Sequence, residues 1–289
     1  MRRLRYFVVV SVVVSLFLNS VVSAATTPPN DRGLLVTPLR DYIAIDPGKT
    51  VEHKIGVANL TPNPMDISLY AEQFSVADYT YDYKFDTPKE DWIKLQTSQL
   101  QLASGASKEV PYTISVPIKG APGGHYFTIF ASAKVGDGKE IRAAVVLYMT
   151  VSGDLIQTSV IKKEIIPTVS FGGDIPFSLD VHDTGNTHFF VYASGHIETW
   201  WHMQPASETA HLLLPKTTRT IDSEIASPML PGVYKAVYGY RTETGQRTEH
   251  SKLIIYMPVW SIAVLLGLVW LVVLFMKRRK RVSKDKLNT

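Results

Sequence analysis

The sequence has 289 residues, a formal net charge of +4 and a pI near 9.0, but its basic residues are concentrated at the two ends. Three of the 30 Lys and Arg residues precede residue 25 and seven follow residue 276, which leaves 20 against 25 Asp and Glu in between. The acidic central part has no basic run, which excludes nucleic acid as its partner. The sequence has no cysteine, which excludes disulfides and lipid attachment through a thiol and favours a bacterial origin.

The N-terminus has the pattern of a secretory signal peptide over residues 1–24. Three arginines in the first five residues precede an apolar run at 6–18, and Ala24 ends a stretch of small residues that a signal peptidase reads. We expect cleavage after Ala24. An uncleaved second anchor is the alternative, although the apolar run is short for a membrane span. Residues 25–33, rich in Thr, Pro and Asn, are predicted to form a tether.

Residues 34–152 have the pattern of a β-sandwich, in which short strands follow one another about every ten residues. Apolar residues occupy every second position at 51–57 and again at 110–116, as expected for strands with one buried face. The glycines at 136–138 predict a hairpin turn. The continuous apolar run at 141–151 predicts a strand that is buried on both faces.

Residues 153–256 repeat this plan. The strand, turn and strand at 176–197 parallel those at 51–71, and the Pro-Gly turn before the strand at 232–237 parallels the one before 123–128. We therefore predict an all-β fold with two tandem immunoglobulin-like sandwiches, which meet near Gly153.

A membrane-spanning helix is predicted at 257–276. No charged residue lies between Lys252 and Lys277, and nineteen helical residues reach about 28 Å, the thickness of the hydrocarbon layer. A buried core helix is the alternative, but such helices rarely end in a basic block. The basic tail at 277–289 is expected to stay in the cytoplasm. The pattern predicts a single-pass type I protein of the cell membrane with both sandwiches outside.

Three segments near the start carry a resemblance to known surface proteins: Leu34-Leu35-Val36-Thr37-Pro38, Ile45-Asp46-Pro47-Gly48-Lys49-Thr50-Val51 and Ile55-Gly56-Val57-Ala58-Asn59. With the Pro-Gly strand at 122–133, the second sandwich, the anchor and the tail, the chain over 34–281 resembles the Gram-positive WxL-interacting surface proteins. The resemblance implies a peptidoglycan-binding sandwich and a second sandwich that binds a partner or host. The first domain more weakly resembles periplasmic pilus chaperones, although the anchor argues against a soluble shuttle.

The main candidate binding surface consists of four aromatic residues that alternate with polar ones: Tyr79, Tyr81, Tyr83 and Phe85. On a strand, all four would project from one face and could stack on sugar rings or on a partner's side chains. The alternative is an amphipathic strand that covers the sandwich core.

Two adjacent tryptophans form a second candidate surface. Trp200 and Trp201 would face opposite ways on a strand, so at least one would be free to contact a partner or the bilayer. Trp92 is instead expected in the core. Six of the eight histidines lie in the second half, but their spacing fits no zinc site, and we predict neither a metal nor a cofactor.

These features predict a membrane-anchored bacterial cell-surface protein for binding, adhesion or scaffolding, without enzymatic activity. Its outer domain is expected to capture a cell-wall polymer or a surface-protein partner, with residues 257–276 in the membrane. The alternative is a structural or chaperone-like subunit that pairs with its partner by strand addition, which an uncovered sheet edge would favour.

Overall fold

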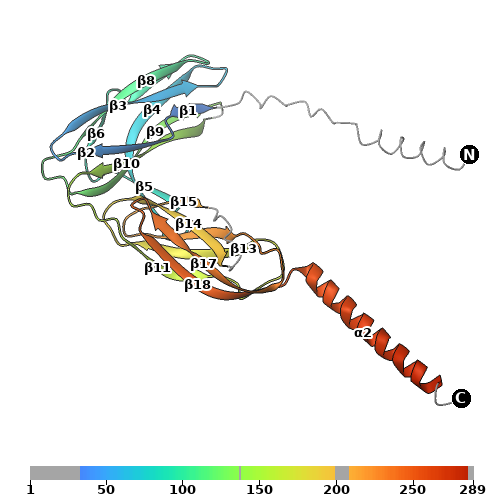
Figure 1. Ribbon diagram of the computed structural model, residues 1–289. Helices are drawn as coiled ribbons and strands as arrows, with labels where there is room; N and C mark the ends of the chain where they lie inside the picture. The colour runs from blue at the N-terminus through green and yellow to red at the C-terminus, as the bar shows by residue number, and fades with distance from the viewer. Residues whose placement is uncertain (1–32, 137, 199–207, 286–289) are drawn as a thin grey trace, which may run out of the picture.

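The computed structural model describes residues 33–136, 138–198 and 208–285, which form two β-sandwiches followed by one helix (Figure 1). The first sandwich contains β1 (Leu34–Thr37), β2 (Arg40–Ile45), β3 (Thr50–Asn59), β4 (Met65–Val76), β5 (Tyr83–Asp86), β6 (Ile93–Leu95), β7 (Gln99–Leu102), β8 (Ser107–Ser115), β9 (Gly123–Val135) and β10 (Lys139–Val151). The second contains β11 (Ser159–Ile165), β12 (Val169–Ser170), β13 (Ile175–Asp183), β14 (Phe189–Glu198), β15 (Thr209–Leu213), β16 (Thr218–Ile225), β17 (Gly232–Thr242) and β18 (Arg247–Tyr256). The helix is α2 (Val259–Asp285). The predicted all-β fold with a C-terminal helix is confirmed.

The two sandwiches share a common order of strands, to which the first adds β5 and β6. In the first, the sheets have the orders β1-β3-β8-β6 and β2-β10-β9-β4-β5, with β7 also paired to β4. In the second, the orders are β11-β13-β16 and β12-β18-β17-β14-β15. In each, a short strand near the start runs parallel to the last strand: β2 beside β10, and β12 beside β18. The repeat seen in the sequence is therefore a repeat of the fold, and the two Pro-Gly turns lead into β9 and β17.

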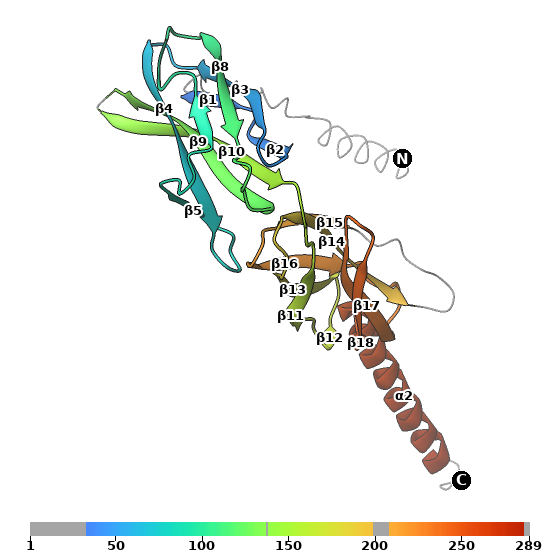
Figure 2. The same ribbon diagram turned by 90° about the vertical axis from the view of Figure 1, so that its left-hand side faces the viewer.

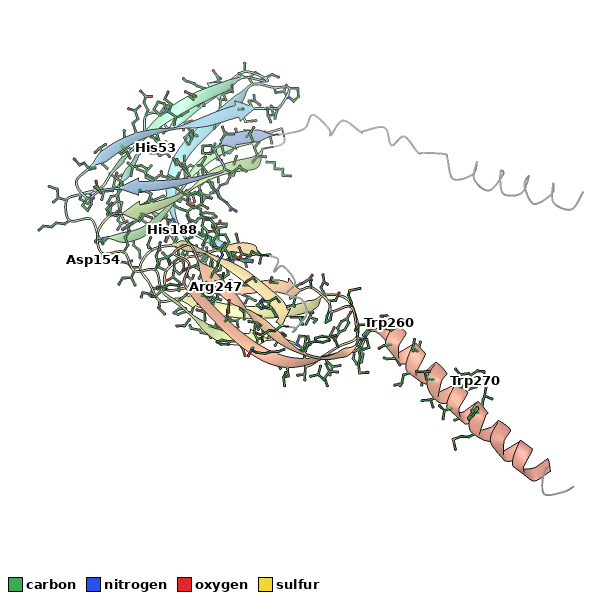
Figure 3. All side chains as sticks on the ribbon, in the orientation of Figure 1. His53, Asp154, His188, Arg247, Trp260 and Trp270 are labelled. Carbon is green, nitrogen blue, oxygen red and sulfur yellow. The ribbon has the colours of Figure 1, made fainter. Side chains whose placement is uncertain are left out.

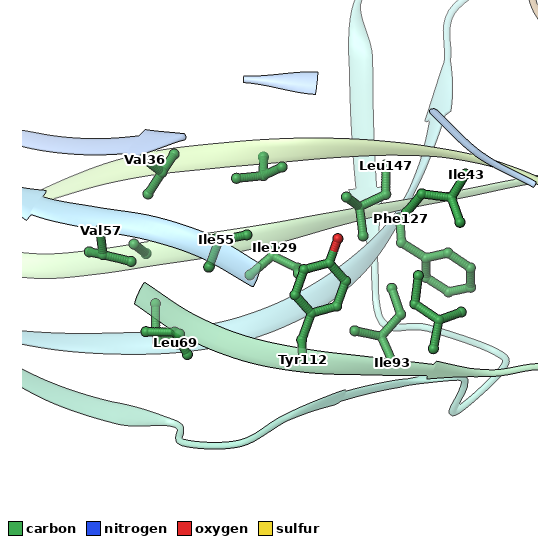
Figure 4. Close-up of a cluster of buried hydrophobic side chains, with 14 of the residues drawn as sticks. Val36, Ile43, Ile55, Val57, Leu69, Ile93, Tyr112, Phe127, Ile129 and Leu147 are labelled. Carbon is green, nitrogen blue, oxygen red and sulfur yellow. The ribbon is translucent and has the colours of Figure 1, made fainter. Parts of the chain in front are cut away.

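Each sandwich has its own core, built from the inward-facing side chains of its two sheets. In the first, Tyr112, Phe127 and Leu147 are fully buried between the sheets (Figure 4), and Trp92 joins this core as expected. In the second, the core includes Phe177 and Tyr238. Alternation at β3 and β13 places every second residue inside, because successive side chains on a strand point to opposite faces.

The prediction for the apolar run at 141–151 was only half right. Leu147, Tyr148 and Met149 are buried in succession, but Ile141 to Ala144 are exposed or half-buried. The outward-facing Tyr148 is buried because the second sandwich packs against it. Beyond the part of β10 that the second sandwich covers, the outer face of this strand is exposed to solvent.

The C-terminal helix leaves the end of the second sandwich that lies away from the first (Figures 1 and 2). Its segment Val259–Met276 has a mean hydropathy of 2.7 and is exposed, so it is long and apolar enough to cross a membrane. The helix continues past the predicted end at 276 to Asp285. The signal peptide at 1–24, nearly all of the tether at 25–33, and residues 286–289 of the tail lie outside the described residues.

Candidate partner-binding edge and aromatic face

One strand of the first sandwich is paired along only part of its outer edge. β2 pairs with β10 from Val146 to Val151, while on the other side β9 pairs with β10 over its full length. No strand in the part of the chain that the structure describes pairs with residues 139–145 on the side away from β9. We call residues 139–145 the open edge. It exists because β1, the strand before β2, lies in the opposite sheet and pairs with β3.

The backbone groups that face outward on the open edge follow from the ladder. The Val146 N–H donates to the Leu39 carbonyl on the β2 side, with 3.1 Å between N and O, the length of a normal hydrogen bond. Because N–H groups alternate sides along a strand, those of Glu140, Arg142 and Ala144 point away from β9 as well. The open edge therefore presents a row of donors and acceptors that another strand can use.

Side chains on the two faces of the open edge differ in character. Ile141 and Ala143 pack against the first core. Arg142 lies on the outer face, where its guanidinium carbon is 4.0 Å from the centre of the Phe130 ring and its Nη2 is 3.7 Å from Glu72 Oε2. The charged and aromatic neighbours restrict which strands can add here, as charges on an edge discourage unselective pairing.

Next to the open edge, the outer face of the same sheet carries a continuous set of aromatic rings. We call this set the aromatic face; its members are Tyr42, Tyr70, Phe74, Tyr83, Phe85, Phe130 and Tyr148. Neighbouring ring centres are 5.0 to 6.0 Å apart, within the range of favourable ring contacts. Tyr42, Tyr83 and Phe85 remain 47%, 40% and 38% exposed, so these three rings are accessible, whereas Phe74, Phe130 and Tyr148 are buried.

The structure corrects the prediction that Tyr79, Tyr81, Tyr83 and Phe85 share one face of a strand. β5 begins only at Tyr83, and the two earlier tyrosines lie in the turn between β4 and β5 with φ of 69° and 60°. Positive φ is uncommon for residues other than glycine and ends the regular alternation. Tyr83 and Phe85 do share the outer face, with ring centres 6.0 Å apart. The four residues therefore divide into two groups with different surroundings.

Tyr81 packs in the junction between the two sandwiches. Its hydroxyl oxygen accepts the Leu214 N–H at 3.0 Å and lies 2.7 Å from Thr217 Oγ1, whose own O–H donates to the Leu214 carbonyl. The Tyr81 hydroxyl is therefore the donor to Thr217. Arg219 lies over the ring, 4.7 Å from its centre. This half-buried tyrosine links the first sandwich to β15, β16 and the turn between them.

The backbone of the same turn pairs with the second sandwich. Tyr79 N–H donates to the Thr218 carbonyl at 2.6 Å, and Thr220 N–H donates to the Tyr79 carbonyl at 3.3 Å. Asp78 Oδ1 accepts the Thr218 N–H at 2.7 Å. These bonds make a short parallel bridge, which explains how the turn holds its left-handed conformation without glycine.

A cluster of buried apolar side chains completes the junction. Phe74, Tyr126 and Tyr148 of the first sandwich pack against Leu212 and Leu214 of the second. This cover removes Phe74 and Tyr148 of the aromatic face from solvent, while Tyr83 and Phe85 stay partly exposed.

Two titratable side chains lie at or near the junction with shifted pKa values. Burial lowers the pKa of His188 to about 4, and this half-buried ring lies between the sandwiches, 3.3 Å from the Tyr126 hydroxyl through Nδ1 (Figure 3). Burial raises the pKa of Asp183 to about 7, although the Gly185 N–H and Lys216 act in the opposite direction. Asp183 Oδ2 has no hydrogen-bond partner among the residues that the structure describes.

Some of the predicted residues are not placed. Trp200 and Trp201 lie outside the described residues. Among the described residues, no three His, Cys, Asp or Glu side chains form a group that could hold a metal ion. The sequence reasoning missed Tyr42 and Arg142. In β2, Ile43 and Ile45 are buried while Tyr42 and Ala44 are exposed, and this alternation could have placed Tyr42 on an outer face.

Comparison with known proteins found no matching family model and no matching curated protein. Among solved structures, the chain is similar to the class 5 fimbriae chaperone CfaA, at 13% identity and a TM-score of 0.41, covering 78% of this chain and all of that one. It is also similar to the E. coli chaperone DraB (10% identity, TM-score 0.37, 77% of this chain and 96% of that one). The Pseudomonas aeruginosa CupB2 chaperone gives 11% identity and a TM-score of 0.35, over 75% of this chain and 99% of that one.

These neighbours correspond to the weaker of the two resemblances, the pilus chaperones, while the resemblance to WxL-interacting proteins stays a prediction. Likenesses this distant carry no argument about function.

Proposed function

We propose that the chain is a membrane-anchored envelope protein that binds a protein partner by strand addition at the open edge of β10. The observation that supports this best is the unpaired stretch at 139–145 in an otherwise paired sheet. Main-chain hydrogen bonds supply affinity in this binding mode, and alternate side chains supply specificity. The role is a non-catalytic one in scaffolding or assembly.

The geometry defines the kind of strand that fits. An added strand lies next to β10 in the line of β2, with its length limited by Leu39 at one end and by the β9–β10 hairpin at the other. Every second side chain faces the core beside Ile141 and Ala143 and should be small or aliphatic. The others face the Arg142 and Phe130 side, where an acidic or aromatic group is favoured.

The helix α2 gives the protein its location in this proposal. It holds the open edge at the surface of a membrane, and the basic residues at 277–289 keep the C-terminus in the cytoplasm with both sandwiches outside. The type I orientation is part of this proposal, and these charges support it.

Replacing Ala144 by proline is expected to abolish strand addition. Proline removes the outward N–H and places its ring against an incoming strand, while the hydrogen bonds to β9 come from Ala143 and Val145 and remain. Peptides as long as the open edge, selected from a random phage-displayed library on the full chain in nanodiscs, provide the probe. Their affinity should fall at least about tenfold in the proline variant, since a backbone hydrogen bond and close contact are lost together.

Ala144→Ser is the matched control, because it keeps the N–H and should bind the selected peptides as the parent does. The selected sequences should also show alternating small aliphatic residues. Peptides that bind Ala144→Pro as tightly as the parent would contradict strand addition at this edge.

The aromatic face supports a second candidate, capture of a cell-wall polymer. Tyr83 and Phe85 lie nearly parallel, with an angle of 10° between their rings, and both are partly exposed, an arrangement suited to stacking on sugars. If the candidate is right, the full chain in detergent sediments with purified sacculi, and Tyr83→Ala combined with Phe85→Ala reduces the bound fraction. Tyr79→Ala, which removes an exposed ring outside the aromatic face, should not. Equal sedimentation of all three proteins, or none by the parent, would rule this candidate out.

A further inference from the structure

The end of the second sandwich next to α2 exposes apolar side chains. Met229 is 88% exposed and Val233 is 67% exposed, and Phe171 and Leu230 are more than half exposed. Large apolar groups gathered on one part of a soluble surface mark a site of contact. This group lies away from the open edge and the aromatic face, in a different domain.

Strand register places these side chains together. Val169, Ile255 and Val233 are in register across β12, β18 and β17, so they lie side by side on the outer face of that sheet. The turn with Met229 and Leu230 leads directly into β17. The Tyr234 hydroxyl donates to the Leu230 carbonyl at 2.8 Å and fixes this turn. We call Val169, Phe171, Met229, Leu230, Val233 and Ile255 the juxtamembrane patch.

The polarity of the same face changes with distance from the helix. On β17, the outward residue after Val233 is Lys235, which forms an ion pair of 2.7 Å with Glu198. On β18, the outward Ile255 and Leu253 are preceded by Ser251. The face is therefore apolar at the helix end and polar farther away, as at a boundary between lipid and water.

The helix is fastened to this end of the sandwich. β18 ends at Tyr256 and α2 begins at Val259. Met257 N–H donates to the Ser170 carbonyl at 2.8 Å, and Val259 N–H donates to the Phe171 carbonyl at 3.1 Å. The apolar residues are thus tied to the first residue of α2, and Figure 2 shows β12, β17 and β18 gathered at the top of α2. Such a short, hydrogen-bonded link leaves little room to lift the patch away from the membrane.

We propose that the juxtamembrane patch inserts into the interfacial region of the lipid bilayer beside α2 and so fixes the orientation of both sandwiches on the membrane. The inference rests on the proposed membrane anchor and goes beyond partner binding. Contact between α2 and lipid would continue directly onto the patch, which argues for lipid rather than a second copy of the chain. Trp260 lies at the start of α2 (Figure 3), and aromatic side chains are enriched at the ends of membrane-spanning helices.

The absence of cysteine in the chain allows a direct test with single-cysteine variants of the full chain in phosphatidylcholine–phosphatidylglycerol vesicles. Met229→Cys and Val233→Cys carry an environment-sensitive fluorophore in the patch. Ile118→Cys, at an 85% exposed site in the first sandwich, is the aqueous control. Gly267→Cys, at an open position in the helix, is the control for the anchor. Quenching lipids carry a nitroxide near the headgroup end or near the terminal methyl of the acyl chain.

We expect the labels at 229 and 233 to lose most of their fluorescence with the shallow nitroxide, the label at 118 to lose none, and the label at 267 to respond to the deep nitroxide. If the labels at 229 and 233 behave like the one at 118 while the label at 267 is quenched, the patch does not insert into the bilayer, although α2 still spans it. If the patch labels are shielded from aqueous iodide but are not quenched by either nitroxide lipid, the patch contacts protein and the proposed insertion into lipid is wrong. An unquenched label at 267 would overturn the anchor itself and the patch with it.

Discussion

Replacement of Tyr81 by alanine is expected to loosen the junction between the sandwiches and to lower the free energy of unfolding by about 2–4 kcal/mol. The ring is half-buried between the domains under Arg219, and its hydroxyl bonds to Leu214 and Thr217. Alanine removes the ring and leaves the Leu214 N–H without its acceptor. Tyr81→Phe should cost about 1 kcal/mol or slightly more, because only the hydrogen bonds are lost.

The loosening can be measured by electron paramagnetic resonance between spin labels on Ile118→Cys and Met229→Cys, one in each sandwich. The distance distribution should be narrow in the parent and broad in Tyr81→Ala. Tyr79→Phe is the matched control, since the contacts of that residue with the second sandwich come from its backbone. A narrow, unchanged distribution in Tyr81→Ala would show that this tyrosine does not hold the junction.

Two further substitutions near the junction are expected to reveal pH dependences of opposite sign. The pKa of His188 is about 4 in the folded chain against an ordinary 6.5, so its contribution to stability is present above pH 6.5 and lost as the pH falls to about 4. The pKa of Asp183 is about 7 against an ordinary 3.8, so its contribution is present below pH 3.8 and lost as the pH rises to about 7. Between pH 4 and 6.5, each group changes the free energy of unfolding by about 1.4 kcal/mol per pH unit, and the two changes have opposite signs.

Removal of either side chain should therefore reveal the pH dependence of stability that the other side chain produces. His188→Gln is expected to make the free energy of unfolding rise on acidification from pH 6.5 to 4, and Asp183→Asn to make it fall, while both groups' contributions cancel in the parent. Urea unfolding at a series of pH values measures all three. Slopes of the same sign in the two variants would show that the opposing shifts are absent.

The sequence was sufficient for the fold because alternation is a local property. The period of two in β3 and β13, the glycines of the β9–β10 hairpin and the long uncharged run of α2 each determine an element without reference to the rest of the chain. The repeated order of strands then indicated that the second sandwich follows the first.

The candidate site could not be predicted to the same extent, because its features arise from long-range contacts. The turn at Tyr79 and Tyr81 contains no glycine, and hydrogen bonds to Thr218 and Thr220 stabilise its left-handed residues from another domain. The open edge depends on β1 joining one sheet and β2 the other. No local pattern in β10 predicts that its neighbour β2 begins only at Arg40 and so pairs with β10 only from Val146 onward.

The most direct test of the account is amide hydrogen exchange along β10, measured on the full chain in nanodiscs with and without a selected peptide. Without peptide, the amides of Arg142 and Ala144 should exchange rapidly while those of Ala143 and Val145, bonded to β9, are protected. Peptide binding should then protect Arg142 and Ala144. If these two amides are already protected in the free chain, or stay unprotected in the complex, β10 has no open edge that accepts a strand.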